Sequence, residues 1–160
     1  MTTLNRLPIL ERRRIQAEVI KPIYESLKTE VGEETAKRII GKAIIEAAID
    51  EGKRFAADHG SSGGIDGFAS FQHLWDADGA LESEVTKHTE DEYVYKVTRC
   101  RYAEMYHAMG VGEIGFQLSC NRDATFVEGY DPRIKLTRTQ TIMQGADYCD
   151  FHYRMTGEDS

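Results

Sequence analysis

Cys120 and Asp123 are a pair of residues whose types and spacing could support chemistry. They stand three positions apart, so a helix through this segment would place the thiol and the carboxylate on one face. A thiol attacks an electrophilic carbon once a base or a neighbouring cation favours its thiolate form. A carboxylate alone has the opposite effect, so a cationic or basic group would have to complete the site. The alternative is that Cys120 only fills the end of a helix.

Arg138 and Cys149 lie in the last two predicted strands. Side chains alternate between the two faces of a strand, and both residues fall on the apolar face that would pack against helices. A buried guanidinium needs a carboxylate partner, because an unpaired buried charge is costly. We therefore expect Arg138 to bind either the carboxylate of a ligand or a carboxylate of the protein. Asp123 and Glu104 are the protein candidates.

Cys100 follows a predicted strand and opens a predicted helix. The positive end of a helix lowers the pKa of a thiol, so the position suits a reactive cysteine; a small buried residue at the corner is the alternative. The histidines and cysteines form none of the close pairs that zinc sites contain, so we expect no metal and no other cofactor. A zinc site assembled from residues far apart in the chain is the alternative.

Two long helices are predicted at the start of the chain, over residues 8 to 31 and 33 to 57. Apolar residues recur at every fourth position of the first helix and form a stripe that would serve either the core or an interface. The stripe consists of Ile15, Val19, Ile23, Leu27 and Val31. Pro22 should kink this helix, and the basic cluster Arg12-Arg13-Arg14 is interpreted as a solvated face. The many alanines of the second helix favour close helix packing.

The rest of the chain is predicted to form shorter elements around a small sheet. They are a helix over 68 to 75, strands over 81 to 88 and 91 to 99, a helix over 102 to 109, a helical stretch from 112 towards 126, and strands over 133 to 142 and 147 to 155. Gly129 and Pro132 should mark a loop, and Gln144-Gly145-Ala146 a tight turn. The predicted class is α+β: an N-terminal helical hairpin and further helices packed on one face of a small antiparallel sheet that ends in a C-terminal β-hairpin.

Length and composition favour a single domain over residues 1 to 160, helical over about 8 to 77 and sheet-containing over about 81 to 155. The net charge of −7 disfavours nucleic acid as a partner. No apolar run reaches the roughly 20 residues of a membrane span, and the N-terminus lacks a signal-peptide pattern. We therefore expect a cytoplasmic protein whose partners are a small-molecule substrate and, in a homo-oligomer, further copies of the chain.

Two segments resemble the motifs of one enzyme family. Residues 98 to 123, TRCRYAEMYHAMGVGEIGFQLSCNRD, contain a cysteine that opens a tyrosine-containing helix and then a C-x-x-D element. Residues 136 to 153, LTRTQTIMQGADYCDFHY, contain R-T-x-T, a glycine and C-D-F. Together these patterns resemble those of the L-2-amino-thiazoline-4-carboxylic acid hydrolases. The residues that match the motifs are Cys100, Cys120, Asp123, Arg138, Thr139, Cys149 and Asp150.

The resemblance implies hydrolytic opening of a small ring that carries a carboxylate, in which a cyclic isothiourea gives an N-carbamoyl amino acid. Cys120 or Cys149 is the expected nucleophile, Asp123 would transfer protons, and Arg138 would hold the substrate carboxylate. The further residues expected to bind substrate are Cys100, Thr139 and Asp150. The alternatives are attack by water with Asp123 as general base, a non-catalytic sensor module that binds a small molecule or haem, and a structural protein.

Overall fold

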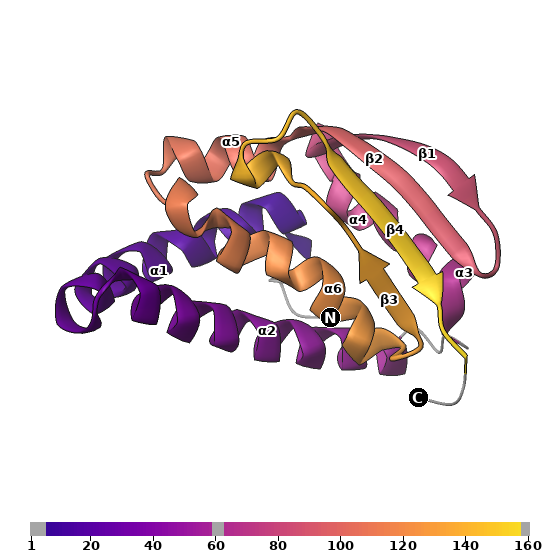
Figure 1. The fold of residues 1–160 in the computed structure, drawn as a ribbon, viewed down its shortest axis with the longest axis horizontal. Helices are drawn as coiled ribbons and strands as arrows, with labels where there is room; N and C mark the ends of the chain where they lie inside the picture. The colour runs from indigo at the N-terminus through magenta and orange to yellow at the C-terminus, as the bar shows by residue number, and fades with distance from the viewer. Residues whose placement is uncertain (1–5, 59–62, 158–160) are drawn as a thin grey trace.

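The computed structural model describes residues 6–58 and 63–157. Its helices cover one face of an antiparallel sheet in which the strand order is β1-β2-β4-β3 (Figure 1). The strands are β1 (Leu81–His88), β2 (Glu92–Cys100), β3 (Ile134–Thr137) and β4 (Cys149–Met155). The predicted α+β class, with helices packed on one face of a small antiparallel sheet, is confirmed.

The helices α1 (Ile9–Val31) and α2 (Glu33–Asp58) form the predicted hairpin, and Gly32 between them has a φ of +85° that favours glycine. α1 continues through Pro22 as one helix. The shorter helical segments are α3 (Gly64–Ala69), α4 (Gln72–Asp76), η2 (Ala77–Gly79), α5 (Arg101–Ala108), η3 (Gly112–Ile114), the π-helical η4 (Phe116–Cys120), α6 (Asn121–Tyr130) and η5 (Ile142–Gln144). Within the described ranges, no helix has the length and apolar character needed to cross a membrane.

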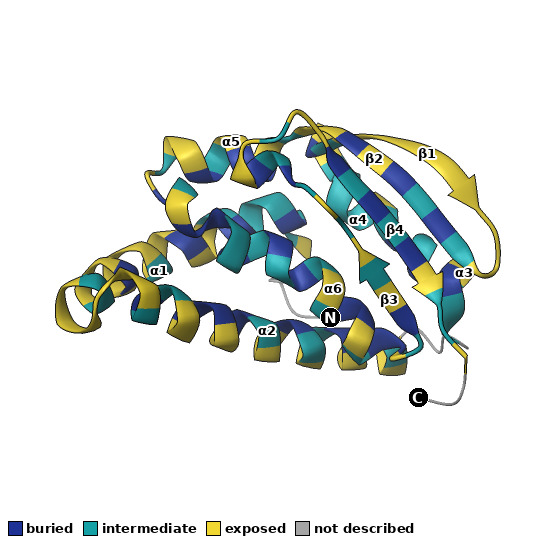
Figure 2. Ribbon diagram, in the orientation of Figure 1, coloured by how far each residue is buried: buried dark blue, intermediate teal, exposed yellow. Residues whose placement is uncertain are grey.

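The predicted apolar stripe of α1 lies largely outside the core. Four of its members are exposed, namely Ile15, Val19, Ile23 and Val31. The buried face of α1 consists instead of Ile9, Arg13, Ala17 and Tyr24. Ile9, Arg13 and Ala17 also recur every fourth position, but on a different side of the helix from the predicted stripe, and this side is the one that packs against α2 and α5. In Figure 2 the outward sides of α1 and α2 are largely exposed.

The helices α2 and α6 are in backbone contact. A Cβ built at Gly52 of α2 would overlap the carbonyl oxygen of Phe126, and one built at Gly129 of α6 would overlap that of Ile49. Any side chain at these two positions would therefore push the helices apart. The close packing predicted for the second helix is present, although the closest contacts are made at glycines and not at the alanines on which the prediction rested. Gly129 was expected in a loop, and this prediction is wrong because the residue lies inside α6.

The buried face of the sheet is aromatic. In β2 the side chains of Tyr93, Tyr95 and Val97 point towards the helices and alternate with more exposed residues. Tyr95 lies opposite Phe151 of β4, and the two rings stack with centroids 4.6 Å apart. β1 pairs with β2 antiparallel, as the sequence predicts.

The C-terminal strands pair as predicted, but the prediction of a tight turn between them is wrong. β3 ends at Thr137, and residues 138–148 form a longer connection that contains η5. The carboxylate of Asp150 accepts hydrogen bonds from the backbone N–H groups of Thr139 and Gln140, at 3.0 Å for the closest oxygen in each case. These donors are thereby satisfied without a strand partner, so the alternating pattern of 138 to 142 does not extend the ladder.

Candidate functional site

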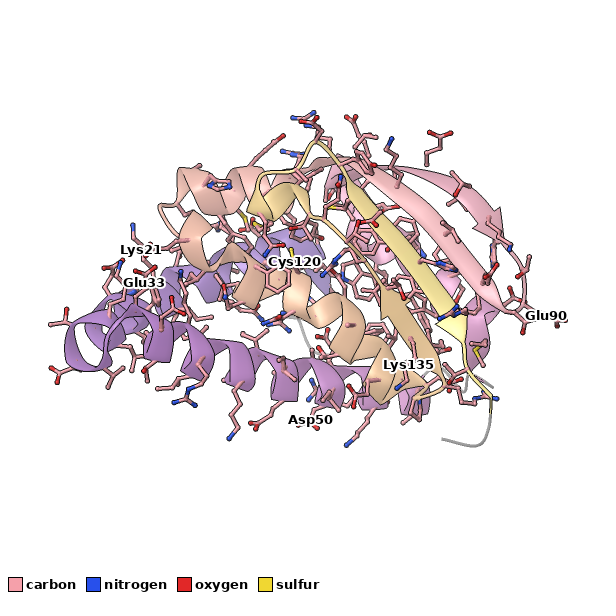
Figure 3. All side chains as sticks on the ribbon, viewed as in Figure 1. Lys21, Glu33, Asp50, Glu90, Cys120 and Lys135 are labelled. Carbon is pink, nitrogen blue, oxygen red and sulfur yellow. The ribbon has the colours of Figure 1, made fainter. Side chains whose placement is uncertain are left out.

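A central cavity lies between the helical layer and the sheet. It has two adjoining lobes with volumes of about 50 Å³ and about 40 Å³. The residues that line both lobes are Arg13, Trp75, Leu81, Arg122, Asp123 and Phe151. In Figure 3 the labelled Cys120 lies in the interior near this region, whereas labelled charged residues such as Glu33 and Asp50 lie at the outline of the molecule.

The structure brings five of the seven predicted site residues together. The larger lobe is lined by Cys100, Cys120, Asp123, Arg138 and Cys149. The other two, Thr139 and Asp150, lie outside the cavity lining and bond to each other, with Thr139 Oγ1 donating to Asp150 Oδ2 at 2.7 Å. Burial opposes the charge of Asp150, but the hydrogen bonds from Thr139 and Gln140 outweigh it and hold the pKa of Asp150 below its ordinary value. This pair fixes the connection after β3.

Arg138 forms an ion pair with Asp123. Its Nη1 lies 2.6 Å from Asp123 Oδ2, and its Nη2 donates to the carbonyl oxygen of Cys120 at 3.1 Å. The guanidinium also stacks over the ring of Phe151, 5.1 Å from its centroid. Burial opposes the Arg138 charge, yet the pKa of Arg138 is raised because Asp123 outweighs this effect. The sequence predicted a carboxylate partner for Arg138 from a ligand or from the protein, and in the structure this partner is Asp123.

Asp123 keeps part of its carboxyl group available to the cavity. About a quarter of its side chain, 26%, is accessible, and since Asp123 lines both lobes this surface faces the cavity. Burial raises the pKa of Asp123, and the charge of Arg138 offsets only part of the rise. A carboxylate with a raised pKa is a stronger base than an exposed one, so Asp123 has the properties of a proton acceptor.

The three thiols differ in the neighbouring groups that favour or disfavour their thiolate forms. All are free, and burial raises the pKa of each. Cys149 Sγ accepts the backbone N–H of Ile142 at 3.1 Å, and Arg138 also favours its thiolate. For Cys120 the charge of Asp123 adds to the effect of burial, and the charge of Arg138 offsets part of it. Asp123 also raises the pKa of Cys149. Cys100 caps α5, yet burial outweighs this helix end and raises its pKa to about 11.

In the described part of the chain, no three His, Cys, Asp or Glu residues are arranged to hold a metal ion. The thiols instead face apolar and cationic neighbours across the larger lobe, including Met143 and Arg138. The arrangement therefore offers nucleophiles, a proton acceptor and positive charge to a ligand in the cavity.

Sequence reasoning missed Arg13, Arg122 and Glu51. Both arginines line both lobes, and Glu51 lines the smaller one. The side chain of Arg13 is 4% exposed, so its assignment to a solvated face is wrong, although its neighbour Arg14 does pair with surface glutamates. Its spacing of four from Ile9 and from Ala17 was the available signal, because all three lie on the buried face of α1.

A second depression, of about 560 Å³, lies between α2 and the segment where η4 meets α6. It is lined largely by exposed charged residues such as Lys42, which pairs with Glu46 at 3.9 Å. It contains none of the predicted site residues. The central cavity is therefore the candidate site.

These features define an α+β protein whose helical layer and antiparallel sheet enclose a cavity lined by thiols, a carboxylate and arginines. The chain belongs to the L-2-amino-thiazoline-4-carboxylic acid hydrolase family, whose model matches residues 12–153. The resemblance carried by the two sequence motifs is thus confirmed. None of the curated proteins matches the chain.

Two solved structures share the fold. One is the phenol-responsive sensory domain of the transcription activator PoxR with phenol, with a TM-score of 0.55, 8% identity, and coverage of 88% of this chain and 76% of that one. The other is trafficking protein particle complex subunit 3 from Naegleria fowleri, covalently bound to palmitic acid, with a TM-score of 0.53, 13% identity, and coverage of 90% and 97%. At these identities the likeness is one of fold alone.

Proposed function

We propose that this protein is a hydrolase that opens a small carboxylate-bearing heterocycle in the central cavity. Family membership supports the reaction class. The observation that carries the proposal is that three thiols, a carboxyl group with a raised pKa and an arginine line one lobe. An electrophilic ring carbon in this lobe would meet both a nucleophile and a proton acceptor.

Cys149 is our preferred nucleophile because it combines an amide donor with the nearby charge of Arg138. Its proton passes to Asp123 while its sulfur bonds to the amidine-like carbon of the ring. Asp123 then returns the proton to the ring atom that leaves, so the ring opens and the carbon stays bonded to sulfur. Water adds to that carbon, the sulfur leaves as the thiol, and the net change is addition of water.

Attack by water is the second version of the reaction. Asp123 would take a proton from water, which would add directly to the ring carbon, and the cysteines would only shape the cavity. The raised pKa of all three thiols favours this version, and the contacts of Cys149 favour the first. Replacing the cysteines one at a time separates the two.

The cavity must widen when a ring enters. Its two lobes, about 50 and 40 Å³, are much smaller than the roughly 300 Å³ or more of a typical small-molecule pocket. Met143 of η5 lines the larger lobe and belongs to the connection after β3. Methionine is unbranched and adaptable, so we expect this wall to make room for the ring.

Turnover of 2-amino-thiazoline-4-carboxylate and a panel of related carboxylated rings tests the proposal, with mass spectrometry to detect addition of water. We expect Cys149→Ser to lower the rate about a hundredfold or more, and Cys100→Ser to lower it far less. Full activity in both Cys149→Ser and Cys120→Ser would contradict attack by either thiol and leave attack by water as the mechanism. No water added to any ring by a folded protein would overturn the hydrolase proposal.

A non-catalytic ligand-binding module is the second candidate. Its support is the fold shared with a phenol-responsive sensory domain, in which the same architecture serves to bind a small molecule. Such a module would bind a ring and release it unchanged, and a haem-binding form would show a Soret absorption band after purification.

We also propose that residues 1 to 160 form one domain that works in the cytoplasm on a small-molecule substrate and not on nucleic acid. The three free thiols fit a reducing compartment. The net charge of −7 opposes binding to a phosphate backbone. Cell fractionation and a nucleic-acid binding assay test these two statements.

A further inference from the structure

The central cavity holds more positive than negative charge. Its two lobes are lined by three arginines, Arg13, Arg122 and Arg138, and by two carboxylates, Glu51 and Asp123. Asp123 already forms an ion pair with Arg138, with 2.6 Å between Asp123 Oδ2 and Arg138 Nη1. Glu51 is therefore left as the carboxylate partner of both remaining arginines, and one positive charge in the cavity wall is uncompensated.

Glu51 is also a distant partner. Its Oε2 lies 3.6 Å from Arg122 Nη1 and 3.9 Å from Arg13 Nη2, both longer than a hydrogen bond. Among the described residues, each of these guanidinium groups makes one further hydrogen bond. Arg122 Nε donates to the carbonyl oxygen of Leu118 at 3.0 Å, and Arg13 Nη1 donates to Gln16 Oε1 at 3.2 Å. A guanidinium has five N–H donors, so both arginines keep donor capacity.

Burial makes this arrangement costly. The side chains of Arg13 and Arg122 are 4% and 10% exposed. Burial, together with repulsion from Arg13, lowers the pKa of Arg122 to about 10. Arg12 stands beside them, and within the part of the chain that the structure describes its buried Nε has no hydrogen-bond partner. Buried cations that outnumber their carboxylates are a cost that an anionic ligand would remove.

We propose that Arg13 and Arg122 form the subsite that binds the carboxylate of the ring, an inference that rests on the proposed function. A carboxylate held between them would accept charge-assisted hydrogen bonds and neutralise the excess charge. Both arginines and Asp123 line both lobes, so a ring anchored there would reach the proton acceptor and the thiols. Arg138, expected from the sequence to bind the carboxylate, keeps Asp123 in place instead.

Binding without covalent capture by Cys149 is the direct test, and mass spectrometry of the titrated sample checks that no water has been added to the ring. The Cys149→Ser chain is titrated calorimetrically with 2-amino-thiazoline-4-carboxylate and with 2-amino-thiazoline, which lacks the carboxylate. We expect the carboxylated ring to bind about tenfold more tightly or better, which corresponds to one or more charge-assisted hydrogen bonds. Equal affinity for the two rings would overturn the subsite, and this comparison needs no arginine variant.

Variants then assign the effect to residues. Added to the Cys149→Ser chain, Arg122→Gln should remove most of the preference for the carboxylated ring. Arg14→Gln should retain it, because Arg14 pairs with Glu11 and Glu18 on the surface of the same helix as Arg13. If Arg122→Gln fails to fold, Arg122→Lys serves in its place. It keeps the charge but cannot make bidentate hydrogen bonds to a carboxylate, so the preference for the carboxylated ring should fall several-fold. A preference untouched by a folded Arg122 variant would overturn the assignment.

Glu51→Gln gives an effect of opposite sign. It removes the competing carboxylate, so the carboxylated ring should bind more tightly, whereas a purely structural role for the three residues predicts weaker binding in every variant. Turnover of the same ring by the unmodified chain is recorded in parallel. Turnover without carboxylate-dependent binding would overturn the subsite alone. Carboxylate-dependent binding without turnover of any ring in the panel would support the subsite and overturn the hydrolase.

Discussion

Arg138 and Asp123 join the connection after β3 to helix α6 through a contact of 2.6 Å between Nη1 and Oδ2. Asp123 thereby has its charge balanced without losing access to the cavity, since 26% of its side chain is accessible. The pair positions the proposed proton acceptor, and it links the two chain segments that carry the family motifs.

Breaking this pair should destabilise the protein in a pH-dependent way. Arg138→Met leaves Asp123 buried beside an apolar side chain, and such a loss costs ~3–5 kcal/mol when the charge persists. The pKa of Asp123 is already raised by burial, so the folded state of the variant favours its protonated form. Its stability is therefore lost as pH rises through the folded pKa and recovered as pH falls. Urea unfolding at pH 5 and pH 8 measures this, with Arg99→Met as an exposed control.

Asp123 should set the acidic limb of the rate profile. It must be ionised to accept a proton, and burial places its pKa above the ordinary value of about 3.9. The value of kcat/KM should therefore fall as pH drops through this raised pKa. Asp123→Asn should lose about a hundredfold or more in rate together with that limb. Glu104→Gln, an exposed partner of Arg99, should keep both, and a profile that is the same in all three proteins would contradict the role of Asp123.

Gly129→Ala should destabilise the fold. Its Cβ would overlap the carbonyl of Ile49, so α2 and α6 must separate, and overpacking of this kind costs ~1–3 kcal/mol. Gly41→Ala in α2 is the matched control. Its Cβ would meet Gln117 and Asn121 at 3.5 Å, an ordinary contact, so helix propensity should add up to ~1 kcal/mol. Thermal unfolding of the two variants should shift in opposite directions.

Asp150→Asn should loosen the connection after β3 rather than abolish substrate binding. The carboxylate accepts hydrogen bonds from Thr139 and Gln140, and we expect a loss of about 1 kcal/mol. Because the folded pKa of Asp150 is lowered, its contribution is present above the unfolded pKa and is lost as pH falls through the folded one. A rise in KM of a hundredfold with no change in stability would instead return Asp150 to the substrate-binding set.

The exposed face of α1 should tolerate polar substitution. Val19 and Ile23 are 60% and 50% exposed, so Val19→Gln and Ile23→Gln should change stability by no more than about 0.5 kcal/mol. Ala17→Gln on the buried face should cost far more, since that position is 1% exposed. The sequence also predicts a homo-oligomer formed through this stripe. Light scattering on the Val19→Gln protein tests it, and a molar mass unchanged from that of an oligomeric parent would contradict it.

Local patterns determine most of the fold. Alternation in residues 91 to 99 correctly predicted β2, and residues 81 to 88 were correctly predicted to pair with it as β1. The glycine at position 32 correctly separated α1 from α2. The segment after Thr137 also alternates, but its N–H groups bond to the carboxylate of Asp150. Such side-chain bonds depend on a residue that lies ten or eleven positions away, so periodicity could not reveal them.

The site was predictable only in part, for a related reason. Cys120, Asp123, Arg138 and Cys149 stand in motifs, and the fold does gather them. Arg13 stands in no motif, and a run of three arginines on a helix resembles a solvated face. Its spacing of four from Ile9 and from Ala17 hinted at the buried face, and the tertiary positions of Glu51 and Arg122 show that the middle arginine turns inward.

The cavity is bounded by α6 and by the connection after β3, and these two segments differ in how much their sequences can change among relatives. The wall formed by α6 is fixed by backbone contact at Gly52 and Gly129, so altering it would require concerted changes in two helices. Residues 141–148 of the connection lie outside the strand ladder, and their number and sequence can change while β3 and β4 stay paired and Arg138 keeps its contact with Asp123. Family members that open rings of other shapes are therefore expected to have acquired that specificity in this connection, by insertion, deletion or replacement around Met143.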